Sequence, residues 1–176
     1  MQQRRTPFSL KINYENDFFK QYQYLAQNET YHAFLESGRG GRYSIAGIKP
    51  IAIAKGKDEK LVVSKDDIQE IFIGNPLDSF QEWFQQFNTI KDESLPDFQG
   101  GAIGFLSYDC VRHFEKLTNL AEDDLQTPDL YFMIFDDVAI YDHEESALWL
   151  ITHTYNVDEK SAAYDKLNGM KAEWTS

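Results

Sequence analysis

The sequence LYFMIFDDVAIYDHEESALWLIT, residues 130–152, holds three short apolar runs separated by turn-forming residues. The runs span residues 130–135, 138–141 and 147–152, and each is rich in the β-branched and aromatic side chains typical of strands. The last two are joined by Asp142-His143-Glu144-Glu145, a length that suits the turn of an antiparallel hairpin. This stretch therefore predicts antiparallel strands that lie next to one another.

Strands of the same kind are predicted upstream of this stretch. Residues 8–14 alternate apolar and polar side chains, as a half-buried strand does. Residues 100–107 are small and apolar throughout, which predicts a central strand or one that another backbone approaches closely. Five more short runs are separated by Gly-rich or charged turns, and we interpret them as an antiparallel meander: residues 33–36, 43–46, 51–55, 61–64 and 68–73.

Three helices are predicted from apolar residues at helical spacing. Asn75 followed by Pro76 predicts the start of the second, because asparagine caps a helix and proline fits its first position. The apolar stripes of the three helices are Phe18, Phe19, Tyr22, Leu25 and Ala26, then Leu77, Phe80, Phe84 and Phe87, and finally Ala163, Leu167, Met170 and Trp174. A further short helix is predicted from Tyr108. The fold class is therefore α+β, with mostly antiparallel sheets and packed helices.

Length and composition place the chain among globular proteins. Its 176 residues suit one domain, and 42% hydrophobic content is enough for a core. A net charge of −12 argues against nucleic-acid or anionic-membrane partners, and no stretch approaches the roughly 18 apolar residues of a membrane span. A single cysteine, Cys110, suits a reducing cytosol, so we predict a cytoplasmic protein. Because no stop signal precedes Ser176 in the last helix, we expect the natural chain to continue.

Candidate chemical motifs have simpler structural interpretations. The glycine-rich residues 38–42 lack the Gly-Lys-Ser/Thr ending of a phosphate loop and predict a tight turn. Cys110 and His113 could share a helix face as thiol and base, but no oxyanion-binding group accompanies them. Acidic and histidine residues near 136–153 could bind a metal, yet we interpret them as solvated side chains at strand ends: Asp136, Asp137, Asp142, His143, Glu144, Glu145 and His153. We predict no catalytic residue and no metal or cofactor site in this chain.

Three blocks of sequence change this picture, because their order and spacing match a known family. They are residues 34–50, with Leu35-Glu36-Ser37 and Gly41 to Gly47; residues 98–109, followed by Arg112 and Glu115; and residues 128–143. Together they resemble the amino-terminal domain of the anthranilate synthase component I and aminodeoxychorismate synthase component I family. Within that family, the resemblance is strongest to aminodeoxychorismate synthases of the Bacillus type, including the tail 148–153.

The resemblance implies a fold and a role. Residues 1–176 would be the amino-terminal part of a sandwich of two antiparallel sheets with interleaved helices, acting as a scaffold or regulatory domain. Chorismate and Mg²⁺ would be bound by a carboxy-terminal catalytic domain absent from this chain, so the chain alone should be inactive. A glutamine amidotransferase subunit would supply ammonia to aminate chorismate, toward para-aminobenzoate and folate. Anthranilate synthase component I, for tryptophan synthesis, and a free-standing amino-acid-sensing module remain alternatives.

The resemblance also implies a ligand pocket. In tryptophan-sensing members, tryptophan lies between the Leu-Glu-Ser block and the catalytic domain. The matching residues here are Glu36, Ser37, Tyr43 and Ser44, with Arg42 adjacent. A carboxylate, hydroxyls and an aromatic ring suit an amino acid with an indole side chain. The alternative is a hairpin in which Glu36 and Arg42 form an ordinary surface ion pair. Because half the walls would be missing, we expect tryptophan to bind this chain weakly or not at all.

Overall fold

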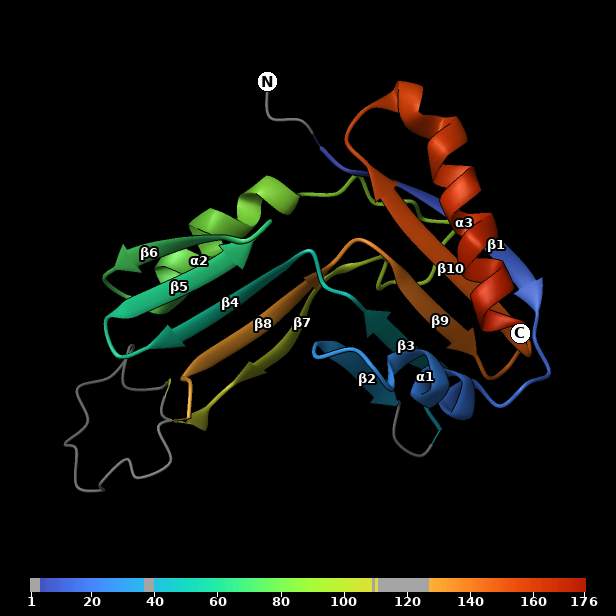
Figure 1. The fold of residues 1–176 in the computed structure, drawn as a ribbon, viewed down its shortest axis with the longest axis horizontal. Coiled ribbons are helices and arrows are strands. Elements are labelled where there is room, and N and C mark those ends of the chain that lie inside the picture. Colours follow the sequence, from blue (N-terminus) through green and yellow to red (C-terminus); the bar gives the residue numbers. More distant parts are fainter. Residues whose placement is uncertain (1–3, 37–39, 109, 111–126) are drawn as a thin grey trace. The chain divides into compact units, whose positions relative to one another are not determined.

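The computed structural model describes residues 4–36, 40–108, 110 and 127–176. The chain divides into two compact units, and each described unit is built around one five-stranded sheet (Figure 1). The first unit comprises Met1–Pro50, Gln86–Gly101 and Phe135–Ser176, and the second comprises Ile51–Gln85 and Ala102–Ile134. The predicted α+β class with antiparallel sheets is confirmed.

The first unit contains the sheet with strand order β1-β10-β9-β3-β2. Its strands are β1 (Thr6–Asn13), β2 (His32–Glu36), β3 (Tyr43–Ile48), β9 (Val138–Asp142) and β10 (Ala147–Thr154). All neighbours are antiparallel, and the register places Leu10 opposite Leu150 and Ala46 opposite Ala139. The hairpin β9–β10 has the turn that the sequence predicted, and Ser146 closes it with a positive φ of 49°.

Two helices cover one face of this sheet, which we call the helix-covered face (Figure 1). They are α1 (Phe18–Ala26) and α3 (Lys160–Trp174), the latter preceded by the 3-10 turn η3 (Val157–Glu159). The helix α1 begins where the Asp17 side chain accepts a hydrogen bond from the Lys20 N–H. The predicted apolar faces of both helices pack against the sheet, except that Phe19 of α1 is 47% exposed. The buried core is formed by Tyr14, Phe18, Tyr22, Ala26, Ala46, Ala139, Leu148, Leu150, Leu167 and Trp174.

The second unit contains the sheet with strand order β6-β5-β4-β8-β7. Its strands are β4 (Ala52–Lys57), β5 (Lys60–Lys65), β6 (Ile68–Ile73), β7 (Gly101–Leu106) and β8 (Leu130–Phe135). The helix α2 (Pro76–Phe84) packs on this sheet, where Phe80 stacks on Phe132 with ring centroids 4.8 Å apart, and η1 (Gln85–Phe87) follows it. As predicted, Asn75 caps α2 by accepting a hydrogen bond from the Leu77 N–H at 2.9 Å.

The prediction of one continuous meander is wrong. The strands β2 and β3 form a hairpin in the first unit, whereas β4, β5 and β6 form a meander in the second. The physical reason is the break at Lys49-Pro50, because Lys49 adopts a positive φ of 58° and proline has no N–H to continue a ladder. The chain therefore leaves β3, which pairs with β9, before β4 begins.

The strand β7 shows the close backbone approach that its glycines predicted. A Cβ placed on Gly104 would lie 1.9 Å from the carbonyl oxygen of Tyr131, so only glycine fits there. Among the described residues β7 has one neighbouring strand, β8, and so lies at the edge of the sheet. The alternative prediction, that residues 100–107 form a central strand, is therefore wrong. Most of the helix predicted from Tyr108 lies outside the described residues. No helix in the described segments combines the length and apolar character that a membrane span requires.

Candidate functional site

The predicted ligand residues gather where β2, β3 and β9 lie side by side. Glu36 ends β2 and lies directly opposite Ser44 of β3, while Tyr43 begins β3 opposite Asp142 of β9. Arg42 immediately precedes Tyr43. Ser37 lies outside the described residues, as do residues 38 and 39 of the predicted turn. The structure thus brings together four of the five predicted residues.

These residues are divided between the two faces of the sheet. Tyr43 and Ser44 are consecutive in β3, so their side chains point to opposite faces. Glu36 and Ser44 share a face with Tyr141, because these three residues are aligned across β2, β3 and β9. Tyr141 stacks on Phe18 of α1, which identifies this as the helix-covered face. Tyr43 belongs to the other face, so a ligand on one face meets only part of the predicted set.

Ser44 is the buried member of the set. Its side chain is 2% exposed, and its Oγ lies 2.8 Å from Nε2 of His143. The His143 backbone N–H donates to the Arg42 carbonyl at 2.8 Å, and its ring meets Tyr141 edge-on. His143 is therefore held on three sides. The hydroxyl of Ser44 is already engaged, so a ligand would have to share it or displace His143.

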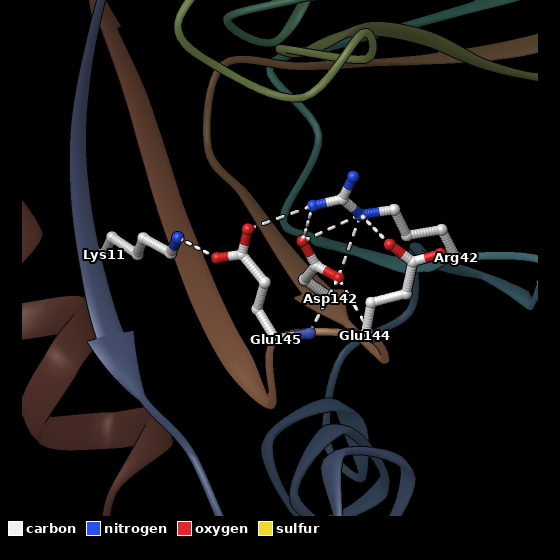
Figure 2. Close-up of polar contacts among 5 residues, drawn as sticks. All are labelled: Lys11, Arg42, Asp142, Glu144 and Glu145. Atoms are coloured by element: carbon white, nitrogen blue, oxygen red, sulfur yellow. Dashed lines mark hydrogen bonds and ion pairs between the residues drawn. The ribbon is translucent and has the colours of Figure 1, made fainter.

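Arg42 is the centre of a charged cluster with Lys11, Asp142, Glu144 and Glu145, shown in Figure 2. Its Nε and Nη2 form a two-pronged contact with the Asp142 carboxylate, the shortest arm being 2.7 Å. Nη2 also lies 3.2 Å from Glu145, and Lys11 bonds the other oxygen of Glu145. Planar guanidinium and carboxylate groups match in this geometry, which makes it a strong and directional contact.

The Asp142 carboxylate is buried and fully engaged. It is 1% exposed, and its Oδ1 accepts the backbone N–H groups of Glu144 at 3.0 Å and Glu145 at 3.3 Å. The hydrogen bond from Arg42 is the main reason that the pKa of Asp142 is lowered, and the same bond raises the pKa of Arg42. Asp142 therefore stays ionised and fixes the β9–β10 turn.

The interpretation of these acidic residues as solvated is wrong for Asp142. It failed because the pairing of Tyr43 with Asp142 brings Arg42 beside a carboxylate that is 100 residues away in sequence. The alternative prediction of a surface ion pair between Arg42 and Glu36 is also wrong. The Arg42 guanidinium pairs instead with Asp142, Glu144 and Glu145. Glu144 remains exposed, as predicted.

A second buried polar cluster was missed by the sequence analysis. Arg5 is 1% exposed, donates from Nε to the Phe87 carbonyl at 2.9 Å, and pairs through Nη1 with Asp136. His153 is 7% exposed, so its interpretation as a solvated side chain is also wrong, and its Nδ1 lies 2.6 Å from the Asp136 carbonyl oxygen. Because a carbonyl only accepts, Nδ1 carries the hydrogen. Burial is the first cause that lowers the pKa of His153, so the ring is neutral. The polar sequence around Arg5 gives no indication that its side chain is buried.

The structure places part of the candidate thiol and metal-binding motifs. Cys110 is buried, and burial followed by the nearby charge of Asp129 raises the pKa of its thiol, which disfavours a nucleophile. Its suggested partner His113 lies outside the described residues. Within the described parts, no group of three or more His, Cys, Asp or Glu side chains is placed to hold a metal ion.

Comparison with known proteins identifies the class. Residues 31–173 match the family model described as chorismate binding enzyme, so the chain belongs to that family. The chain is 49% identical over 175 residues to "Aminodeoxychorismate synthase component 1" of Bacillus subtilis (strain 168), covering 99% of this chain and 37% of the relative. It is 34% identical over 126 residues to "Anthranilate synthase component 1" of Acetivibrio thermocellus, covering 69% of this chain and 26% of the relative. The resemblance found in the sequence is confirmed.

A solved structure supports the same conclusion. The crystal structure of anthranilate synthase component I from Streptococcus pneumoniae TIGR4 is similar with a TM-score of 0.61 and 25% sequence identity. The match covers 88% of this chain and 34% of that one. The chain thus spans little more than a third of the length of these relatives.

Proposed function

We propose that the chain is the amino-terminal part of aminodeoxychorismate synthase component I. The observation that carries the proposal is 49% identity over 175 residues to the Bacillus subtilis synthase, against 34% over 126 residues to an anthranilate synthase. In this proposal the longer protein aminates chorismate with ammonia from a glutamine amidotransferase subunit. The product leads to para-aminobenzoate and folate, and the reaction takes place in the cytoplasm.

In this proposal the chain contributes architecture, and the chemistry lies elsewhere in the longer protein. Mg²⁺ and chorismate are bound outside the chain. The ion pairs of Arg42 with the buried Asp142 and of the buried Arg5 with Asp136 fix the strand ends and connections of the first unit. A rigid scaffold of this kind holds a neighbouring active site in place.

A hybrid enzyme tests this function. The segment of the Bacillus subtilis relative that aligns with residues 1–176 is replaced by this chain, and amination of chorismate is followed with ammonia and Mg²⁺. We expect the hybrid to make aminodeoxychorismate, because this chain supplies the matching scaffold, and we expect the 176-residue chain alone to consume no chorismate. Product chromatography distinguishes aminodeoxychorismate from anthranilate.

Three outcomes would contradict the proposal. A folded hybrid that makes no product would show that this chain does not replace the aligned segment. Restored activity in a hybrid with an anthranilate synthase, but not with the Bacillus relative, would favour that alternative. Chorismate consumption by the isolated chain, abolished by a mutation in the chain, would show catalytic groups within it.

We also propose that Glu36, Ser37 and Ser44 form one wall of a tryptophan pocket in the longer protein, with Arg42 adjacent, while Tyr43, whose side chain belongs to the opposite face of the sheet, is left out of this wall. The support is the alignment of Glu36 with Ser44 at one edge of the sheet and the burial of Ser44. Calorimetry on the longer protein and its Ser37→Ala variant is the test, with weaker tryptophan binding expected in the variant. Equal affinities would contradict a role for Ser37, and tight binding to the 176-residue chain would contradict a shared pocket.

A further inference from the structure

A cavity of about 400 Å³ lies on the helix-covered face of the first unit. Ala46 and Ala139 form its floor; they pair across β3 and β9 and are both buried. Leu25 of α1 forms one wall, and Met170 and Trp174 of α3 form the other. The volume falls within the range of small-molecule sites, and the floor and walls are apolar, as in most such sites.

Gly169 lines the same cavity from the interior of α3. Glycine destabilises a helix relative to alanine, so a glycine at such a position needs a reason. Packing does not supply it, because a Cβ placed on Gly169 would meet no atom within 4 Å. The missing side chain instead leaves the cavity open on this side.

Four charged residues line the cavity: Lys49, Asp137, Lys166 and Glu173. Lys166 pairs with Asp137 at 2.7 Å, and Lys49 pairs with Glu29 at 3.2 Å. Glu173 also lines the cavity, and among the described residues its carboxylate has no cationic partner. Lys49, Lys166 and Asp137 thus have partners, and Glu173 is left as the unpaired charge among these four lining residues. An additional cation, and not an anion, would balance the opening.

We propose that this cavity binds a small organic ammonium ion, with its apolar body on the alanine floor and its charged group beside Glu173. Burial of the apolar body in the cavity supplies most of the affinity, and the unpaired carboxylate supplies the preference for a cation. The net charge of −12 also draws cations toward the protein. The cavity lining contains none of the described residues predicted for the tryptophan pocket, Glu36, Arg42, Tyr43 and Ser44, so this is a different set of residues.

Three probes of nearly equal shape test the proposal: phenethylamine, phenethyl alcohol and hydrocinnamate, which are a cation, a neutral molecule and an anion. Calorimetry and ligand-observed NMR on the purified protein measure their binding. We expect phenethylamine to bind with a Kd on the order of 1 mM. The alcohol should bind about five-fold more weakly, because it lacks the contribution of one partly exposed ion pair to the binding free energy. The anion should bind more weakly still.

Variants connect the binding to this cavity. Glu173→Gln should reduce phenethylamine binding to the level of the alcohol, whereas Asp165→Asn, an exposed acid on the same helix, should change nothing. Gly169→Leu should fill the cavity and abolish binding of all three probes. Gly169→Ala should raise Tm by about 2–4 °C, which shows that the helix tolerates a side chain there. Equal binding of the three probes, or phenethylamine binding unchanged in Glu173→Gln, would overturn the proposal.

Discussion

Replacing Arg5 with alanine is expected to lower the free energy of unfolding by about 3–5 kcal/mol, the usual cost of removing one partner of a buried ion pair. The Arg5 side chain is fully buried and serves both the Phe87 carbonyl and the Asp136 carboxylate. Its loss leaves an unpaired carboxylate that is only 14% exposed and a carbonyl without its donor. Urea denaturation followed by circular dichroism measures the change.

Matched variants separate the ion pair from the general effect of losing a long side chain. Arg4→Ala removes the same kind of residue from the neighbouring exposed position, and its effect should stay within about 0.5 kcal/mol. The double variant Arg5→Met/Asp136→Asn should recover part of the loss seen in Arg5→Met, because it removes both charges together. If Arg5→Ala and Arg4→Ala lowered the free energy of unfolding by equally small amounts, the buried ion pair would not contribute to stability.

Replacing Asp142 with alanine is expected to cost about 2–3 kcal/mol at neutral pH, because charge-assisted hydrogen bonds and two turn N–H groups lose their acceptor. The cost should depend on pH. The folded pKa of Asp142 is lowered, while the unfolded value is about 3.9. The stabilisation is therefore present above about pH 4 and is lost as the pH falls further through the folded pKa. Chemical denaturation at a series of pH values from 7 to acid measures this.

Glu144→Gln provides the control, because Glu144 belongs to the same turn and contacts the same arginine but is 68% exposed. We expect it to change stability by less than about 0.5 kcal/mol at any of these pH values. The informative result is the convergence of Asp142→Ala with the wild-type protein in acid. A cost that stayed constant down to the lowest pH would mean that ionisation of Asp142 does not contribute.

Much of the local structure could be predicted because it depends on nearby residues. The cap at Asn75-Pro76 and the apolar stripe of α3 are short-range patterns, and both are confirmed. The hairpin turn after Asp142 was predicted for the same reason. The family could also be recognised, since its blocks carry glycines whose positions are fixed by backbone contacts, as Gly104 against Tyr131 illustrates.

The assignment of strands to sheets could not be predicted in this way. It depends on pairings between distant segments, such as β3 with β9. It also depends on the positive φ of Lys49, and a lysine in the sequence gives no indication of a positive φ. The burial of Arg5 and Asp142 was equally hidden, because charged residues are exposed by default and only their partners from elsewhere in the chain allow them inside. The cavity over Ala46 and Ala139 depends on the same long-range pairing.

The pairing of β1 with β10 has a consequence for synthesis of the protein. Thr6 lies opposite Thr154 and Asn13 opposite Ala147, so β1 must wait for the synthesis of β10 before it can join the sheet. At translation rates of about 5–20 residues per second, that wait lasts roughly 7–30 s. During it, the apolar side chains of β1 lack their partner strand, while the strands of the second unit, β4 to β8, are all synthesised before β10. A chaperone would therefore find the most exposed apolar surface on the incomplete first unit, before β10 has been made.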